Sequence, residues 1–426
     1  MVDLVVLALV IFGFGLVSRR VEGTVLTAPL VFVVAGAILG PGGLGLVEFG
    51  LDDHTVLLVG EIALAIVLFT AAASINLSSL RRNEGLPLRL LCVGMPLTIA
   101  LGAAAAVLLL TDLTFWEAAI VGTVLAPTDA ALGQAVVSNP RVPARVREAL
   151  DVEAGLNDGL SVPFLALFLT LAVAEEQIQP ASYWLRFAAE QIGLGTLVGV
   201  GVGLGGGWLV SLASKREWMT DSFQRLALLA LAIIAWALAD QVGGNGFIAA
   251  FVGGLVIGPT VEQIGERLIR FTEAEGQLLN LSVFFIFGVL VIGVIQPLSW
   301  EVAVYALISL TLVRLLPVAV SLVGTRLRVV SVLFMGWFGP RGLASIVLGL
   351  IVVAEAPQLA GREEIEAVVA LTVLLSVVLH GVTAAPFAEA FARRVDGMPP
   401  DAPEKGGRIE VKTRKGSLPS SDLKGR

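Results

Sequence analysis

Apolar runs long enough to cross a lipid bilayer recur along the whole chain and limit its possible folds. We count thirteen, and a helix needs about 20 residues to cross roughly 30 Å of hydrocarbon. Of the 426 residues 56% are hydrophobic and 15% are charged, whereas soluble domains average roughly 45–50% and about 25%. A soluble core cannot hide that excess, so we predict an all-α polytopic membrane protein. The runs are approximately 2–17, 25–39, 56–73, 88–110, 116–137, 149–173, 184–212, 223–238, 247–257, 278–295, 302–322, 329–353 and 368–392.

The loops between these runs alternate in charge. Lys and Arg in short loops gather on the cytoplasmic side of a membrane, so we assign the basic loops to the cytoplasm. The basic set is Arg19, Arg20, Arg81, Arg82, Arg89, Arg141, Arg145, Arg147, Lys215, Arg216, Arg225, Arg267, Arg270, Arg326, Arg328, Arg393 and Arg394. The acidic set is Glu48, Asp52, Asp53, Asp112, Glu117, Glu175, Glu176, Glu301, Glu355, Glu363, Glu364 and Glu366. Only Arg186 and Arg362 depart from the alternation.

This alternation predicts the topology. Thirteen spans that end in the cytoplasm put the N-terminus outside, in a multi-pass protein of the cell (inner) membrane. We assign residues 1–394 to the transmembrane domain. Residues 395–426 are rich in Pro, Gly, Ser and Lys, and we expect them to form a flexible cytoplasmic tail.

Three short motifs occur twice, in the same order and a little over 210 residues apart. Such collinear matches indicate a duplicated unit, with copies at about 25–173 and 247–392. The copies begin at the second and the ninth span, and this offset of seven spans is odd, so the copies have inverted topology, as in secondary transporters. The pairs are "LVFVVAGAILGP" (30–41) with "IAAFVGGLVIGP" (248–259), "LAPTDAALG" (125–133) with "FGPRGLASI" (338–346), and "NDGLSVPF" (157–164) with "HGVTAAPF" (380–387).

Prolines occupy the middle of two repeat-related spans. Neither Pro127 nor Pro340 can donate a hydrogen bond to the preceding turn, so both helices should break near mid-membrane. Two crossing broken helices leave bare N–H and C=O groups, with positive and negative partial charge respectively. Thr128 and Asp129 follow the first proline and Arg341 follows the second. We therefore expect an acid and a base to compensate the half-helix ends.

Few ionisable groups lie within the spans, where each costs about 2.5–3.5 kcal/mol on insertion scales. They comprise four acids, two arginines and one histidine that can be neutral or charged. Two arginines can neutralise two carboxylates, which leaves at least one acid without a partner. The set is Glu61, Asp129, Glu153, Asp158, Arg314, Arg341 and His380.

The sixth span carries two of these acids. Glu153 and Asp158 are five residues apart, which separates them by about 140° around a helix. Asn157 shares a face with Glu153 and is expected to hydrogen-bond its carboxylate. We expect Glu153 to form a core salt bridge with Arg314 or Arg341.

Asp158 is the leading candidate for the unpaired acid, because Gly159 beside it thins the helix and can admit water and ions. Burial disfavours a charged carboxylate, so protonation competes with the binding of a cation. Alternating access then gives antiport. Oxygen ligands suit Na⁺ or Li⁺, and the broken span offers the Thr128 hydroxyl and main-chain carbonyls.

Three motifs together resemble the NhaP-type sodium/proton antiporters, the branch of the cation:proton antiporter family that includes the eukaryotic sodium/proton exchangers. They are "APTD", "EAGLND" and "GPRGLAS", in the fifth, sixth and twelfth spans. The resemblance covers about 25–392. It implies a thirteen-helix fold and a homodimer in a lipid bilayer, with a core of about 88–173 and 302–392 that rocks against the remaining, dimerisation helices. We expect no enzyme activity, no cofactor and no nucleic-acid partner, only a transported cation and a proton.

The resemblance also implies residue roles. Asp158 becomes the ion-binding aspartate that holds the transported Na⁺, Asn157 its neighbour, and Thr128 and Asp129 the broken-helix site. Glu153 with the arginines becomes the core salt bridge. The electrogenic branch has Asp in place of Asn157, so this chain resembles the electroneutral members, with one proton exchanged for one cation.

Two positions depart from the family pattern. Ala130 follows Asp129 where the family commonly has Pro, and Ala154 follows the glutamate where many members have Ser. A hydroxyl ligand is thus missing one turn before Asp158, and Ser161 or a water molecule can replace it. These departures leave the choice among Na⁺, Li⁺ and K⁺ open, with a K⁺/H⁺ antiporter as the alternative.

Other classes of membrane protein fit the sequence less well. A membrane-embedded enzyme would need a histidine metal motif or a nucleophile with its base, and the chain has only His54 and His380. Proton-pumping respiratory subunits use intramembrane lysines, whereas the first lysine is Lys215, in a loop. An anion transporter would need an unpaired arginine, and the buried acids outnumber the bases.

Overall fold

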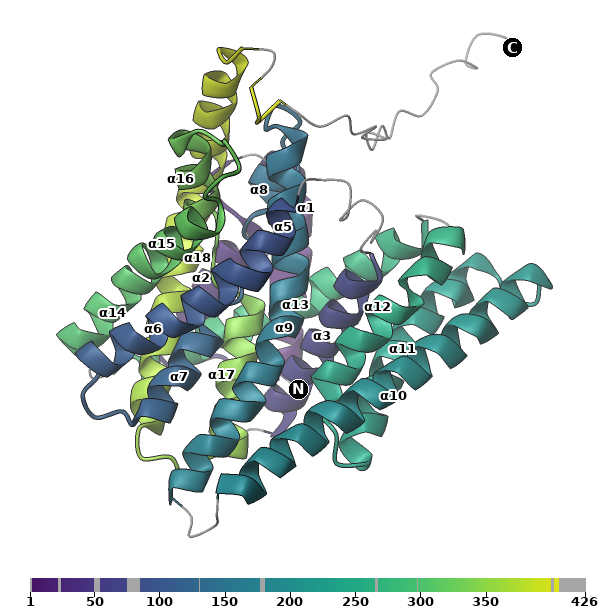
Figure 1. Ribbon diagram of the computed structural model, residues 1–426, viewed down its shortest axis with the longest axis horizontal. Helices are drawn as coiled ribbons and strands as arrows, with labels where there is room; N and C mark the ends of the chain where they lie inside the picture. The colour runs from purple at the N-terminus through teal and green to yellow at the C-terminus, as the bar shows by residue number, and fades with distance from the viewer. Residues whose placement is uncertain are drawn as a thin grey trace.

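A computed structural model describes most of the chain (Figure 1). Several expectations fall outside the described residues: the acidic pair Asp52 and Asp53, the basic pair Arg81 and Arg82, and the tail beyond Lys405. The described residues are 2–21, 24–49, 54–74, 85–129, 131–176, 181–264, 267–296, 298–399 and 402–405.

Every regular element in these ranges is a helix. In chain order they are α1 (Val2–Val21), α2 (Ala28–Leu39), α3 (His54–Ala73), α5 (Leu86–Arg89), the π-helix η1 (Leu90–Gly94), α6 (Met95–Leu109), α7 (Phe115–Val124), α8 (Gln134–Val137), α9 (Ala144–Glu176), α10 (Ala181–Lys215), α11 (Asp221–Gln241), α12 (Gly246–Ile264), α13 (Arg267–Val294), α14 (Trp300–Leu310), α15 (Leu312–Ser321), α16 (Val329–Trp337), α17 (Leu343–Glu355) and α18 (Arg362–Asp396).

The helices correspond to the expected spans. Within the described residues nine helices are long and apolar enough to cross a membrane, and four shorter apolar helices accompany them. Together they coincide with the thirteen runs found in the sequence. The prediction of an all-α polytopic membrane protein is therefore confirmed.

Both predicted helix breaks are present. The fifth span divides into α7 and the short α8, and the twelfth divides into α16 and α17. A third division, which the sequence analysis did not predict, separates α14 from α15 at Thr311. The breaks lie between Val124 and Gln134 and between Trp337 and Leu343, where Pro127 and Pro340 occur.

Each copy of the repeat packs one of its helices against a helix of the other copy. Helix α2 of the first copy lies against α13, where a Cβ atom on Gly36 would overlap the carbonyl oxygen of Phe285. Its counterpart α12 lies against α3, where a Cβ on Gly254 would overlap the carbonyl of Phe69. Equivalent glycines thus allow equivalent close contacts between the copies, as an inverted repeat requires.

The glycine-rich run 193–207 is part of α10. Cβ atoms added to Gly199 or Gly203 would crowd main-chain carbonyls of α12, and one added to Gly195 would crowd the carbonyl of Asn245 just before α12, whereas Gly201 faces open space. The glycines that contact α12 recur every four residues, on one face of α10. The glycine-rich run therefore permits close contact between α10 and α12.

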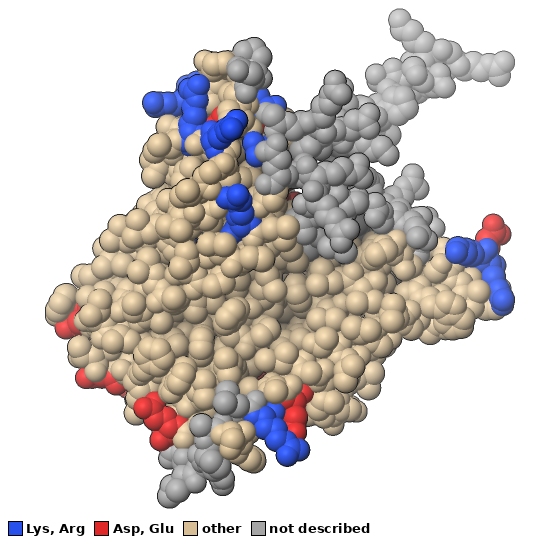
Figure 2. Space-filling view, in the orientation of Figure 1, with Lys and Arg blue, Asp and Glu red and all other residues tan. Residues whose placement is uncertain are grey.

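Charged side chains gather at opposite ends of the molecule. Figure 2 shows Lys and Arg at the end near α16 and α8, and mainly Asp and Glu at the other end. The two exceptions to the alternation are neutralised locally. Arg186 lies 2.7 Å from Glu190 and Arg362 lies 2.7 Å from Glu366, each one helical turn away.

The C-terminal segment is packed further than predicted. Helix α18 continues to Asp396, and Met398 and Ala402 are buried beside the basic end of the helices. Arg145 at the start of α9 donates to the carbonyl of Pro403 at 2.6 Å. Residues 395–399 and 402–405 therefore pack against the helices, because two apolar side chains and hydrogen bonds hold them there.

Candidate functional site

The two broken spans meet at their breaks. The main-chain N–H of Asp129 donates to the carbonyl of Pro340 at 2.7 Å, and both residues are buried. A main-chain hydrogen bond thus joins the two extended segments directly. Half-helix ends of both copies are brought together in the interior, where their partial charges are unscreened.

The carboxylate of Asp129 accepts hydrogen bonds from main-chain N–H groups on both sides of this crossing, where the broken helices leave them without a helical partner. One oxygen accepts from the main chain of Leu343 at 2.8 Å, the first residue of α17. The other accepts from Ala131 at 2.7 Å and Leu132 at 3.0 Å. A negative charge lies where the α17 N-terminus is positive, which is the favourable arrangement.

Arg341 performs the complementary role. Its Nη1 donates to the carbonyls of Ala126 at 2.5 Å and Pro127 at 3.0 Å, just after α7 ends. The Ser345 hydroxyl donates to the Val124 carbonyl at 2.7 Å. A fully buried cation therefore faces the negative end of a half-helix. The structure places an acid and a base at these ends.

Two glycines beside Pro340 make room for charged side chains. A Cβ atom on Gly342 would overlap the carboxylate of Asp129, and one on Gly339 would overlap the guanidinium of Arg314. The sequence "GPRG" thus contributes the charge of Arg341, and its two glycines leave space for the charged groups of Asp129 and Arg314.

Glu153 pairs with Arg314 and leaves Arg341 to the main chain. The two distances between guanidinium nitrogens and carboxylate oxygens are 2.5 and 2.9 Å, and both side chains are 3% exposed. This pair fixes α9 against α15. The expectation that Asn157 hydrogen-bonds Glu153 is wrong, because the guanidinium of Arg314 occupies both oxygens of that carboxylate.

Asn157 instead reaches the first break. Its Nδ2 donates to the Thr128 hydroxyl oxygen at 2.7 Å, and its buried Oδ1 has no hydrogen-bond partner among the residues that the structure describes. Asp158, the next residue, is half-buried, and within the same described ranges its Oδ1 has no partner either. The Ser161 hydroxyl donates to the main-chain carbonyl of Asp158 at 2.6 Å, so its hydrogen is used within α9. Two adjacent positions of α9, of which Asn157 contacts Thr128, thus each carry a side-chain oxygen with no partner among the described residues.

Gly159 does not open a path for water, contrary to the expectation from the sequence. The ring of Phe251 on α12 lies against it, and a Cβ atom on Gly159 would overlap that ring. Exposure follows the other direction along α9, where Asp151 is exposed and Gly155 and Asp158 are half-buried. These positions, four and three residues apart, share a helix face. They lead from Asp158 toward the basic end of the molecule.

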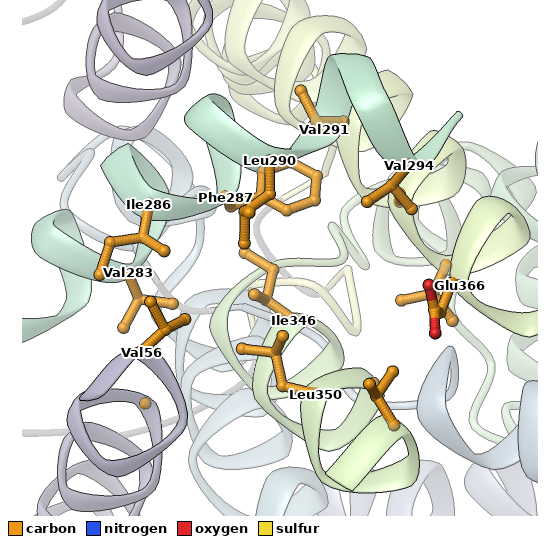
Figure 3. Close-up of a pocket in the computed structure, with 15 residues that line it drawn as sticks. Val56, Val283, Ile286, Phe287, Leu290, Val291, Val294, Ile346, Leu350 and Glu366 are labelled. Carbon is orange, nitrogen blue, oxygen red and sulfur yellow. The ribbon is translucent and has the colours of Figure 1, made fainter. Parts of the chain in front are cut away.

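A separate apolar pocket lies toward the acidic end. Figure 3 shows Val283, Ile286, Phe287, Leu290, Val291 and Val294 of α13 facing Ile346 and Leu350 of α17 and Val56 of α3, with Glu366 of α18 at one side. A second cavity, which shares Leu290, Val294 and Glu366 with it, is also lined by Asp112, Glu363 and Glu364. The residues at the crossing line neither cavity. Neither cavity therefore reaches the crossing.

A resident metal centre is not indicated. Among the residues that the structure describes, no group of three or more His, Cys, Asp or Glu side chains can hold a metal ion. A cation at Asp158 would have to draw further ligands from hydroxyl, amide or main-chain oxygens, all hard ligands of the kind that Na⁺ and K⁺ bind.

The sequence resembles known exchangers along nearly its whole length. A family model described as "Sodium/hydrogen exchanger, transmembrane" matches residues 5–390. The K(+)/H(+) antiporter NhaP of Alkalimonas amylolytica is 28% identical over 98% of this chain and 72% of its own length. The K(+)/H(+) antiporter NhaP2 of Shewanella oneidensis is 27% identical over 78% of this chain, which spans 56% of that relative.

A solved structure shares the fold. The sodium proton antiporter MjNhaP1 from Methanocaldococcus jannaschii superposes with a TM-score of 0.74 at 20% identity, over 91% of this chain and 97% of that one. The inverted repeats and the crossing breaks are consistent with this fold, and the family model matches residues 5–390. This chain belongs to the transmembrane sodium/hydrogen exchanger family.

Proposed function

We propose that this protein is a secondary active antiporter that exchanges a monovalent cation for H⁺, with both competing for Asp158. One observation carries the proposal: Asp158 has a buried carboxylate oxygen that has no hydrogen-bond partner among the described residues. An uncompensated buried charge is costly, so the carboxylate must take up either a proton or a cation.

The other charges at the crossing already have partners. Glu153 is paired with Arg314, Asp129 accepts from main-chain N–H groups, and Arg341 donates to main-chain carbonyls. Because three amides occupy Asp129, we propose that it positions the half-helices and that Asp158 is the exchanging group.

Neighbouring oxygens complete the proposed cation site. The Oδ1 of Asn157 has no partner in the described part of the chain, and the hydroxyl oxygen of Thr128, which accepts from Asn157, keeps a lone pair. With the carboxylate of Asp158 these are hard oxygen ligands suited to Na⁺ or Li⁺. Ser161 can contribute its hydroxyl oxygen. The site contains one exchanging carboxylate because Asn157 is neutral, which supports electroneutral exchange of one proton for one cation.

K⁺ is a second candidate for the transported ion. The two relatives compared above are named K(+)/H(+) antiporters. Ala154 is buried and offers no hydroxyl one turn before Asp158. A site with fewer fixed ligands leaves more room for the larger ion.

We further propose the orientation and the assembly. The basic end lies in the cytoplasm, the acidic end outside, with the N-terminus outside and the C-terminus cytoplasmic in the cell (inner) membrane, because the charge separation in Figure 2 follows the positive-inside rule. The helices of about 88–173 and 302–392, which hold the crossing, would move as a core against the remaining helices in a homodimer.

Proteoliposomes with an imposed pH gradient test the function. Addition of Na⁺, Li⁺ or K⁺ should collapse the gradient with wild-type protein, and the effective ion identifies the substrate. The variant Asp158→Asn should abolish the collapse, whereas Asp240→Asn, at an exposed carboxylate near the end of α11, should retain it. Equal activity in Asp158→Asn and wild type, or no collapse by any ion with wild type, would refute the proposal.

A further inference from the structure

Two buried side chains of α18 contact opposite sides of the second break. Ser376 and His380 lie four residues apart, and both are fully buried. The main-chain N–H of Arg341 donates to Ser376 Oγ at 2.6 Å. His380 Nε2 lies 2.9 Å from the carbonyl of Trp337, the last residue of α16. Together they span the break between Trp337 and Leu343.

A neutral His380 with its hydrogen on Nε2 gives these bonds one direction. The Trp337 carbonyl can only accept, so it is satisfied when Nε2 carries the hydrogen. Nδ1 lies 3.2 Å from Ser376 Oγ and 3.0 Å from the Ser376 carbonyl. Ser376 Oγ accepts from Arg341 and still has its own hydrogen to donate to Nδ1. In the neutral ring, one chain of hydrogen bonds runs from Arg341 through Ser376 and His380 to Trp337.

The first copy of the repeat uses the same position in the same way. The motifs "NDGLSVPF" and "HGVTAAPF" align Asn157 with His380. Asn157 donates to Thr128 in the first break, as His380 donates to Trp337 beside the second. The next residue is Asp158 in the first copy and Gly381 in the second. Both copies thus tie a long helix to their own break, but only the first adds a carboxylate.

We infer that Ser376 and His380 are positioning residues of the exchanger, which hold both half-helix ends of the second break so that Arg341 stays on the carbonyls of Ala126 and Pro127. His380 acts as a neutral donor at Nε2 and an acceptor at Nδ1. The effect of Ser376 and His380 on the exchange rate rests on the proposed antiport, whereas their hydrogen-bond arrangement does not.

Nuclear magnetic resonance of ¹⁵N-histidine tests the arrangement independently of transport. The chain contains two histidines, His54 and His380, so the variant His54→Gln leaves one imidazole to observe. We expect the neutral Nε2–H tautomer, with an Nδ1 signal that shifts in Ser376→Ala. An Nδ1–H tautomer or an imidazolium in the full-length protein would overturn the inference.

Exchange kinetics test the positioning role. Ser376→Ala and His380→Leu should each lower the maximal exchange rate by about fivefold or more, as loss of a buried hydrogen bond implies, with the half-saturating cation concentration unchanged. Ser376→Thr keeps the hydroxyl and should restore the rate. Thr383→Ala is the matched control, because Thr383 also bonds Trp337, accepting from its indole Nε1 at 3.0 Å, away from the break.

The control should exchange at the wild-type rate. Equal loss in Thr383→Ala and Ser376→Ala, or a changed half-saturating concentration at an unchanged maximal rate, would overturn the positioning role. Wild-type protein that exchanges no cation would refute the proposed function, and the histidine spectrum would still decide the hydrogen-bond arrangement.

Discussion

Replacing Glu153 by Gln should destabilise the protein, because it leaves the charge of Arg314 buried without a counterion. Gln has nearly the same size as Glu, so the change removes the charge and little packing. Both side chains of the pair are 3% exposed. Water cannot reach Arg314 to replace the lost carboxylate, and Gly339 packs directly against the guanidinium.

The size of the effect follows from this burial. Removing one partner of a buried ion pair costs about 3–5 kcal/mol. An unfolding entropy of about 2 cal/mol/K per residue, applied to 426 residues, amounts to roughly 0.9 kcal/mol/K. The expected fall in Tm is therefore about 3–6 °C. The double variant Glu153→Gln, Arg314→Met should recover part of this loss, since it removes the unpaired charge.

Thermal unfolding of purified protein in detergent measures the difference. Arg186→Gln is the control, because it breaks an exposed ion pair. The side chain of Arg186 is 80% exposed and that of its partner Glu190 is 52% exposed. Exposed pairs contribute about 0–1 kcal/mol, so this variant should unfold within about 1 °C of wild type. Equal shifts for Glu153→Gln and Arg186→Gln would refute the reasoning.

Three further outcomes are expected. Gly342→Ala should abolish exchange while Asp129→Asn only slows it, because a Cβ atom at 342 overlaps the Asp129 carboxylate; transport assays on both variants compare them. Gly199→Ala should lower the Tm and Gly201→Ala should not, since only Gly199 faces a carbonyl of α12. Burial raises the pKa of Glu404, but hydrogen bonds from main-chain N–H groups and from a serine hydroxyl, with a nearby arginine, lower it more, so the pKa lies below its ordinary value. Glu404 therefore stabilises the packed C-terminal segment above its unfolded pKa of 4.5, and this is lost as the pH falls through the lower folded pKa. Glu404→Gln should lower the Tm at pH 7, and the difference from wild type should vanish in acid.

The sequence predicted the features that follow from hydrophobic length and from proline. Runs of apolar residues located all thirteen spans, because a bilayer allows backbone polar groups no partners except those within a helix. Pro127 and Pro340 located two breaks, since each lacks an N–H. The division at Thr311 carries neither Pro nor Gly, so no local signal marked it; the hydroxyl there donates to the carbonyl of Leu307 at 2.6 Å.

Side-chain partners depended on the tertiary structure. Helix spacing suggested Asn157 beside Glu153, but the guanidinium of Arg314, 161 residues away along the chain, takes that carboxylate. Gly159 looked like an opening, and Phe251 from another helix fills it. A spacing rule describes one helix and contains no information about what neighbouring helices present to it.

The relation between cation affinity and pH tests the central claim most directly. In proteoliposomes, the half-saturating concentration of the transported cation is measured at several pH values for wild-type protein. If H⁺ and the cation compete for the single carboxylate of Asp158, this concentration should rise toward about tenfold for each unit that the pH falls, with the maximal rate unchanged. A half-saturating concentration that is independent of pH would contradict competition at one site, and a rise near a hundredfold per unit would indicate two protons.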